Sequence, residues 1–194
     1  KQSPGEVRGH QFMELDLFDK PDRYIKMKIA FGHKMGSGKD TAVSYLVSRY
    51  GGKRLAFATP LYDIQEYAQR TCGFKLEKDR RFLQMVGTEW ARRMDPDVWI
   101  RLLLGNAPLE GNSYLSDLRF LNELEALKDS GWVCVKLVRP TAGERAGTGC
   151  PEHQSEQDLD NVPNSKWDHI IHNVGTIEEF HRELDNLVSK INDP

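Results

Sequence analysis

Cysteine is scarce in this chain of 194 residues, which contains only Cys72, Cys134 and Cys150. The number is odd, and no two of these cysteines show CxxC spacing. Neither a disulfide framework nor a zinc site is therefore indicated, because both need cysteines in paired or clustered positions. We expect each cysteine to be a reduced thiol.

The sequence also lacks a long hydrophobic run and an excess of charge of one sign. No apolar stretch approaches the roughly 20 residues that cross a bilayer, and no basic-then-apolar signal segment opens the chain. The 27 lysines and arginines nearly balance 29 acidic residues, for a net charge of -2. Without a global positive field, nucleic acid and anionic membranes are not expected partners. We expect a soluble, cytoplasmic protein that binds a small molecule.

The chain length fits one domain with a core and a ligand cleft, and no internal repeat divides it. Residues 1–26 mix proline, glycine and charged residues, and they precede Met27, which could itself be a native start. Met13 is a second candidate start. We expect residues 1–26 to be an N-terminal arm or a segment added ahead of the native chain, and residues 27–194 to form the functional domain.

A glycine-rich loop with a lysine is the most informative motif. Residues 29–41 read IAFGHKMGSGKDT, so that a strand leads through the loop to a helix start. In such a loop, backbone N–H groups converge on an anion, the helix dipole adds positive charge, and the lysine reaches the β- and γ-phosphates. The sequence predicts that a nucleoside triphosphate binds to Gly36, Ser37, Gly38, Lys39, Asp40 and Thr41.

Two positions depart from the GxxxxGK[ST] pattern of phosphate-binding loops. His33 stands where the first glycine is expected, with Gly32 one place early, which suggests a wider start to the loop. Asp40 stands where a serine or threonine would touch the metal, and Thr41 is then the nearest hydroxyl. We expect Mg²⁺ to be held near Asp40 and Thr41, directly or across a water.

Strand and helix patterns alternate along the rest of the chain. Strands are expected at 27–31, 53–57, 113–116, 132–138 and 168–172. Helices are expected at 41–50, after the Thr59-Pro60 break, at 77–94 with an interruption at Gly87-Thr88, and at 97–104, 121–130 and 177–190. This alternation predicts an α/β P-loop NTPase fold of three layers, with a doubly wound parallel sheet and ligands at the carboxyl ends of its strands.

A long loop at 140–166 is rich in glycine, proline and polar residues and follows a strand that ends at Arg139. A loop of this length in a compact domain is usually functional or disordered. We expect a lid that excludes water from phosphoryl transfer and carries Arg139 and Arg145 to the transferring group. The alternative is a solvated surface loop.

Phosphoryl transfer also requires cations that hold the acceptor phosphate, a task for which the planar arginine side chain is well suited. Adjacent arginines on a helix point in different directions, so only one member of each pair can face a site. Arg119 is favoured because it follows a strand that borders the expected crevice. Asp117 could order a metal or simply cap a helix. The paired candidates are Arg80 with Arg81 and Arg92 with Arg93.

Several segments taken together resemble the signatures of deoxynucleoside monophosphate kinases, a family known from DNA viruses and bacteriophages. These segments are RRFLQMVGTEW at 80–90, DVW at 97–99, SDLRFLNE at 116–123, GWVCVKLVRP at 131–140, HQSE at 153–156 and DHIIHNVGT at 168–176. The resemblance runs from about Met27 to the C-terminus. Tyr62 departs from the pattern, because relatives commonly carry a basic residue there, and this departure leaves the base preference open.

The resemblance implies transfer of the γ-phosphate of ATP to a deoxynucleoside monophosphate, with magnesium, in the cytoplasm of the host if the source is viral. It also implies an acceptor pocket lined by Thr59, Pro60, Arg80, Arg81, Gly87, Thr88, Trp99, Asp117, Arg119 and Glu123.

We expect Lys39, Arg119, Arg139 and Arg145 to act on the transferring phosphate. Two other functions stay open: a P-loop kinase for another small phosphate acceptor, such as phosphomevalonate, and a nucleotide-binding switch without acceptor chemistry. The general frequency of C₂ dimers among soluble enzymes also suggests a homodimer.

Overall fold

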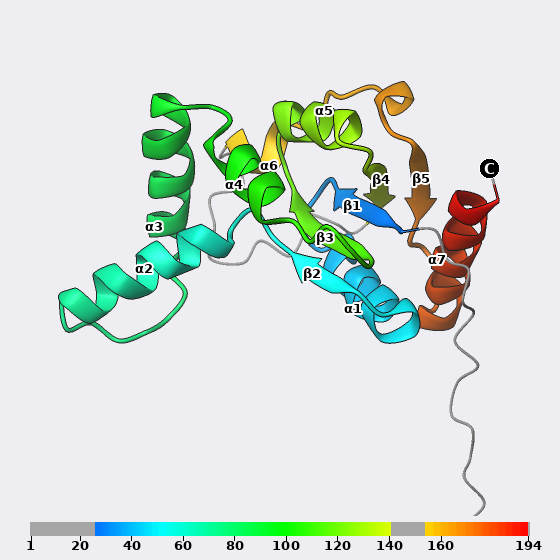
Figure 1. Cartoon of the computed structure of the whole chain (residues 1–194), viewed down its shortest axis with the longest axis horizontal. Coiled ribbons are helices and arrows are strands. Elements are labelled where there is room, and N and C mark those ends of the chain that lie inside the picture. Colours follow the sequence, from blue (N-terminus) through cyan, green and yellow to red (C-terminus); the bar gives the residue numbers. More distant parts are fainter. Residues whose placement is uncertain (1–25, 141–153, 194) are drawn as a thin grey trace, which may run out of the picture.

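The computed structural model describes residues 26–140 and 154–193, and these residues build a five-stranded parallel sheet (Figure 1). The strands lie in the order β2-β3-β1-β4-β5. Their bounds are β1 Lys28–Gly32, β2 Lys53–Leu55, β3 Ser113–Leu118, β4 Val133–Val138 and β5 His169–His172. All four pairings are parallel, so the carboxyl ends of the strands share one edge of the sheet. Strand β1, which leads into the glycine-rich loop, is at the centre.

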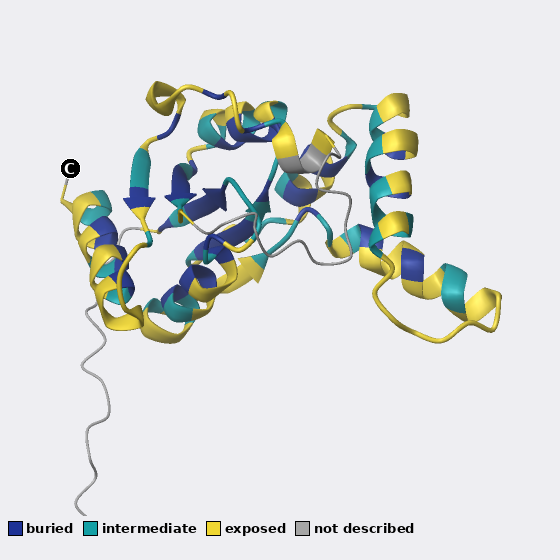
Figure 2. Cartoon of the chain, turned by 180° about the vertical axis from the view of Figure 1, so that it is seen from behind, coloured by how far each residue is buried: buried dark blue, intermediate teal, exposed yellow. Residues whose placement is uncertain are grey.

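Helices cover both faces of the sheet, as the doubly wound prediction requires (Figure 1). The first face carries α1 and α7, which pack with Phe31 and Val135. The opposite face carries α4 and α5, which pack with Ala30 and Cys134. Strands β1, β3 and β4 are mostly buried, whereas the edge strand β2 and the outer helix surfaces are exposed (Figure 2). The helices of these two layers are α1 Lys39–Tyr50, α4 Val98–Asn106, α5 Leu121–Asp129 and α7 Ile177–Asn192.

A helical arm projects from the carboxyl edge of the sheet and consists of α2 Thr59–Thr71 and α3 Arg80–Gln84 (Figure 1). Helix α3 continues directly into a π-helix, Met85–Arg92. The interruption predicted at Gly87-Thr88 is therefore a widened helical turn rather than a break. A wider turn is a common feature of functional sites. At Gly87 an added Cβ would come within 2.8 Å of Leu61, so the glycine lets the π-helix approach α2.

Part of the loop predicted at 140–166 is folded against the core. Residues 141–153 lie outside the described residues, but the chain from 154 onward forms the short helix α6 Gln154–Gln157 and a 3₁₀ turn, Asn164–Lys166. Leu159 and Val162 are buried in the same cluster as Trp167. Three apolar side chains therefore anchor residues 159–167 to the core, while most of the residues between them are exposed, and the lid at 140–166 stays a prediction. None of the helices in the described ranges is long and apolar enough to cross a membrane.

Candidate active site

The glycine-rich loop leaves the central strand and turns into α1 through a glycine that no other residue could replace without strain. Gly38 has φ of 105° in the left-handed region, and an added Cβ would lie 2.6 Å from the amide nitrogen of Asn173. The same amide donates to the carbonyl of Ser37 at 2.9 Å. Asn173, which follows β5, therefore fixes the loop from the side, a contact that the motif at 29–41 did not reveal.

His33 and Gly32 explain the irregular start of the loop. His33 has φ of 89°, the left-handed conformation that normally favours glycine. An added Cβ on Gly32 would lie 2.5 Å from the ring of Trp167, so this glycine serves a packing contact. The imidazole Nδ1 lies 3.3 Å from the carbonyl oxygen of Leu137, and burial is the largest cause that lowers the pKa of His33. His33 thus adopts the loop conformation itself, and the shifted glycine has a different role.

The side chain of Lys39 is held at the loop by two main-chain carbonyls. Its Nζ lies 2.8 Å from the oxygen of His33 and 2.6 Å from that of Lys34. The residue is buried, at 9% exposure, yet it lines a cavity. The loop therefore holds the ammonium group at its own carbonyls beside the cavity, and the start of α1, where an anion is stabilised, borders the same cavity.

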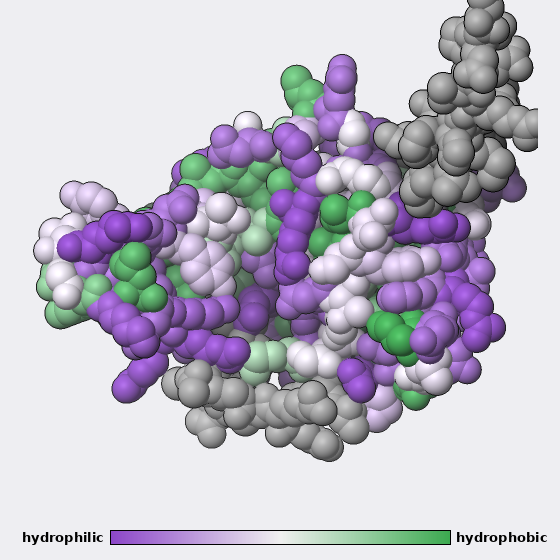
Figure 3. All heavy atoms as spheres, turned by 90° about the horizontal axis from the view of Figure 1, so that it is seen from below, coloured by the Kyte–Doolittle hydropathy of each residue, from purple (hydrophilic) through white to green (hydrophobic). Residues whose placement is uncertain are grey.

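A cavity of about 590 Å³, the central cavity, runs from the glycine-rich loop to the π-helix. A space-filling view from below the orientation of Figure 1 shows a hollow between the arm and the body of the molecule, bordered by hydrophilic side chains (Figure 3). Cationic side chains outnumber the carboxylates that line the cavity, which favours a polyanionic ligand. The cations are Lys39, Arg54, Lys78, Arg80, Arg92, Arg119 and Arg139, and the carboxylates are Asp40, Asp117 and Glu123.

The central cavity brings together most of the residues that the sequence proposed. Those that line it are Gly36, Gly38, Lys39, Asp40, Thr41, Arg80, Gly87, Thr88, Trp99, Asp117, Arg119, Glu123 and Arg139. Four others do not line it. Ser37 is a loop residue whose side chain is buried, and Arg81 and Thr59 are exposed. Pro60 precedes Leu61, which does line the cavity. Arg145 lies outside the described residues.

A buried ion pair between Arg92 and Glu123 forms the inner wall of the cavity. One carboxylate oxygen of Glu123 pairs with the guanidinium of Arg92, and the other accepts the backbone N–H of Arg119 at 2.9 Å and of Phe120 at 3.1 Å. The guanidinium also lies 3.9 Å above the ring of Phe120. Burial raises the pKa of Glu123 to about 7, against the opposing effect of Arg92. The carboxylate of Glu123 thus binds the side chain of Arg92 and the backbone N–H of Arg119.

Asp117 and Trp99 have structural partners at the cavity wall. The carboxylate of Asp117 accepts the backbone N–H groups of Phe57 and Ala58, each at 3.0 Å, and thereby fixes the segment between β2 and α2. Burial raises the pKa of Asp117, and these two hydrogen bonds oppose the rise. The indole of Trp99 donates to the carbonyl of Gly87 at 2.9 Å and is only 4% exposed. Trp99 is therefore both a core residue and a cavity-lining residue.

The predicted metal position carries an exposed carboxylate that faces the cavity. Asp40 accepts the Ser116 hydroxyl at 2.8 Å and pairs with Arg54, and Thr41 follows it on α1. Within the described ranges, no cluster of three or more His, Cys, Asp or Glu side chains could hold a metal without further ligands. Mg²⁺ commonly binds through one or two protein oxygens together with waters and substrate phosphates. The oxygens of Asp40 and Thr41 fit that kind of site.

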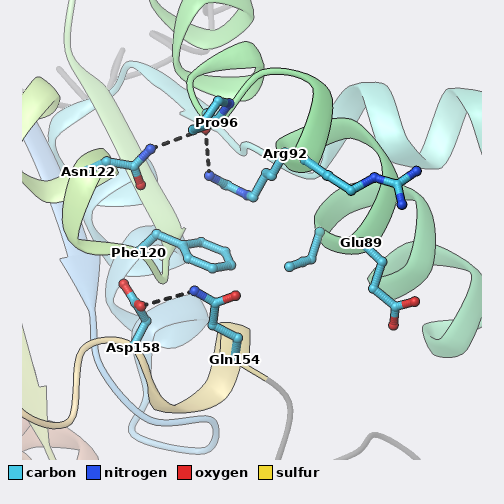
Figure 4. A pocket seen from close by; sticks show the side chains of 9 residues that line it. Glu89, Arg92, Pro96, Phe120, Asn122, Gln154 and Asp158 are labelled. Carbon is cyan, nitrogen blue, oxygen red and sulfur yellow. Dashed lines mark hydrogen bonds between the residues drawn. The ribbon is translucent and has the colours of Figure 1, made fainter.

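A second cavity, of about 660 Å³, adjoins the first and shares Thr88, Arg92 and Phe120 with it. Figure 4 shows Arg92 reaching over the ring of Phe120 from one side, and Gln154 lying on the other side. Arg92 and Asn122 both donate to the carbonyl of Pro96 at 3.1 Å. These contacts join the π-helix to the starts of α4 and α5.

Two viral proteins are similar to this chain in sequence. No family model matches the chain. The chain is 28% identical over 184 residues to a "putative deoxynucleotide monophosphate kinase" of Acanthamoeba polyphaga mimivirus, covering 79% of this chain and 91% of that protein. It is 35% identical over 140 residues to the uncharacterised protein ORF77 of Ictalurid herpesvirus 1 (strain Auburn), covering 68% of this chain. The chain spans 58% of the length of that herpesvirus protein.

Two solved kinases share the architecture at low sequence identity. A gluconokinase from Sinorhizobium meliloti 1021 superposes with a TM-score of 0.51 at 14% identity, covering 88% of this chain and 95% of that chain. A shikimate kinase from Acinetobacter baumannii, in complex with shikimate, gives 0.54 at 16% identity, covering 88% and 97%. The chain has the α/β P-loop NTPase fold. This fold and the parallel sheet confirm the fold class predicted from the alternation of strands and helices.

Proposed function

We propose that this protein is an ATP-dependent deoxynucleoside monophosphate kinase, and that residues 27–194 form its kinase domain. One observation carries the proposal: a single cavity joins the phosphate-binding loop to a set of arginines on the arm and at the end of β3. A kinase needs these two anion sites side by side, because donor and acceptor phosphates must meet in line. The likeness to the mimivirus protein supports the nucleotide acceptor.

The donor end of the cavity is proposed to hold the ATP phosphates. The N–H groups of Gly36 and Gly38 and the ammonium of Lys39 would bind the β- and γ-phosphates. Mg²⁺, bound by the oxygens of Asp40 and Thr41, would neutralise part of the phosphate charge. Because this chemistry relies on positioning and electrostatics, no covalent enzyme intermediate is expected.

The acceptor end is proposed to hold the monophosphate between Arg80 and Arg119. Their guanidinium groups would bind phosphate oxygens in a bidentate manner, with Thr88 and Trp99 in the wall nearby. Glu123 would act through the arginines that it fixes rather than on the substrate, since its oxygens are already engaged.

The test is a product assay. The protein is incubated with ATP, Mg²⁺ and one acceptor at a time, and diphosphates are separated by chromatography. Four deoxynucleoside monophosphates, their ribose counterparts and phosphomevalonate serve as acceptors. We expect a deoxynucleoside diphosphate and ADP in equal amounts. Product from phosphomevalonate alone would favour the other kinase, and nucleotide binding without any phosphorylated product would favour the switch.

The matched variants for this assay are Arg119→Ala and Arg70→Ala. Arg119 lines the cavity, whereas Arg70 lies on the outer surface of α2 and pairs with Glu66. We expect Arg119→Ala to reduce kcat/KM for the acceptor by about 10²-fold, and Arg70→Ala to leave it unchanged. Equal activity of both variants would contradict the proposed acceptor site.

A further inference from the structure

Three side chains from three different elements meet beside the glycine-rich loop. Asp40 lies in the first turn of α1, Arg54 in β2 and Ser116 in β3. The guanidinium of Arg54 pairs with one oxygen of Asp40 and lies 2.9 Å from the Ser116 hydroxyl. The same hydroxyl donates to that carboxylate oxygen at 2.8 Å. All three residues line the central cavity, so their arrangement faces the position of the nucleotide phosphates.

Arg54 and a metal ion would compete for one carboxylate. Asp40 occupies the motif position whose side chain touches the metal, and in this structure its negative charge is balanced by a guanidinium. The side chain of Asp40 is 78% exposed and that of Arg54 is 45% exposed. Exposed ion pairs are weak because water competes for both partners, so a divalent cation held by phosphates can replace the guanidinium.

We propose that Arg54 is a displaceable counter-ion of Asp40 and sets how strongly nucleotide binding depends on Mg²⁺. This inference rests on the nucleotide site proposed above. Without metal, Arg54 prevents the carboxylate from repelling the phosphates; with metal, Mg²⁺ takes over that neutralisation and Arg54 gives up the carboxylate. The position of Ser116, hydrogen-bonded to both residues, keeps Asp40 oriented toward the cavity in either state.

The experiment measures ADP binding by calorimetry in EDTA and again in excess Mg²⁺. The Kd in EDTA divided by the Kd in Mg²⁺ gives the ratio that is compared between variants. We expect Arg54→Ala to weaken metal-free binding about three- to tenfold and so to raise the ratio, because the carboxylate is left unbalanced. Arg54→Lys, which keeps the charge, should stay close to the wild-type ratio. Arg70→Ala is the matched control, since it removes an exposed ion pair outside the cavity.

The decisive comparison repeats the Arg54→Ala substitution in a protein that already carries Asp40→Asn. With the carboxylate gone, Arg54 has no charge to balance, so adding Arg54→Ala should change the ratio by less than about twofold. If Arg54→Ala leaves the ratio unchanged in the wild-type background while unfolding at a lower temperature, the pair is purely structural and the inference is overturned. If the wild type binds neither ADP nor ATP in either buffer, the proposed function fails together with it.

Discussion

Within each pair of adjacent arginines, the two residues have different surroundings. Arg80 and Arg92 line the central cavity, whereas Arg81 and Arg93 do not line it. Because consecutive helical residues point about 100° apart, the sequence could predict that one of each pair faces the site. It could not choose which one, because the choice depends on how α3 and the π-helix are oriented toward the sheet.

Lys39 gives the sharpest prediction for a single side chain. We expect Lys39→Ala to reduce kcat by at least about 10²-fold, since no other residue of the loop offers a cation to the donor phosphates. Lys34→Ala is the matched control, because Lys34 is a loop lysine whose side chain pairs with Asp160 instead of lining the cavity. Product formation and thermal unfolding are measured for both variants. Near-normal turnover of Lys39→Ala would contradict the assignment of the loop.

The raised pKa of Glu123 predicts that the free energy of unfolding depends on pH. The ordinary pKa of 4.5 rises to about 7 on burial, so ionisation of this carboxyl opposes folding. Its stabilising contribution is therefore complete below about pH 4.5 and is lost as the pH rises through 7. We expect the free energy of unfolding of the wild type to fall relative to that of Glu123→Gln between pH 5 and 8.

Denaturant titrations across this pH range measure the difference. Glu66→Gln is the control, because Glu66 is exposed on α2 and pairs with Arg70 at the surface. Its difference from the wild type should stay within a few tenths of a kcal/mol. A difference between wild type and Glu123→Gln that is constant with pH would contradict the predicted titration.

At the scale of elements, the strand β1 and the loop that follows it depend on the segment after α6. Gly32 packs against Trp167, and both belong to segments that the sequence placed far apart. Apolar and glycine patterns predicted the strands and the helix α1 almost to their bounds. They did not predict the π-helix, because a widened turn arises from packing against α2 and leaves the 3.6-residue pattern nearly intact.

We expect Gly32→Ala to destabilise the fold by about 1–3 kcal/mol, because the new methyl group would enter the space of the Trp167 ring. Gly105→Ala in α4 is the matched control, since nothing lies within 4 Å of its added Cβ. That substitution should stabilise by about 0.5–1 kcal/mol through helix propensity. Chemical unfolding measures both changes, and equal stability of the two variants would argue against the contact.

For the whole molecule, the described members of one core cluster begin at Met27, which is 1% exposed and packs with β1 and α7, and those of the other begin at Ala30. Truncation before Lys26 should therefore preserve the fold. We expect the shortened protein to unfold cooperatively at a temperature within about 2 °C of the full chain, measured by calorimetry, because the residues that the structure describes from Met27 onward already form both clusters. A drop well beyond that value would show that residues 1–25 contribute to the domain.

The sequence by itself determined the local features: the loop at 29–41, the alternation of strands and helices, and the edge of the sheet where the central cavity lies. Each follows from spacing along the chain, since glycine, lysine and apolar periodicity act over a few residues. Only the tertiary structure decided that Arg54 balances Asp40, that Arg92 is held by Glu123, and that Asn173 supports Ser37. Those partners lie 14 to 136 positions apart, and their contacts depend on how the helices pack on the sheet.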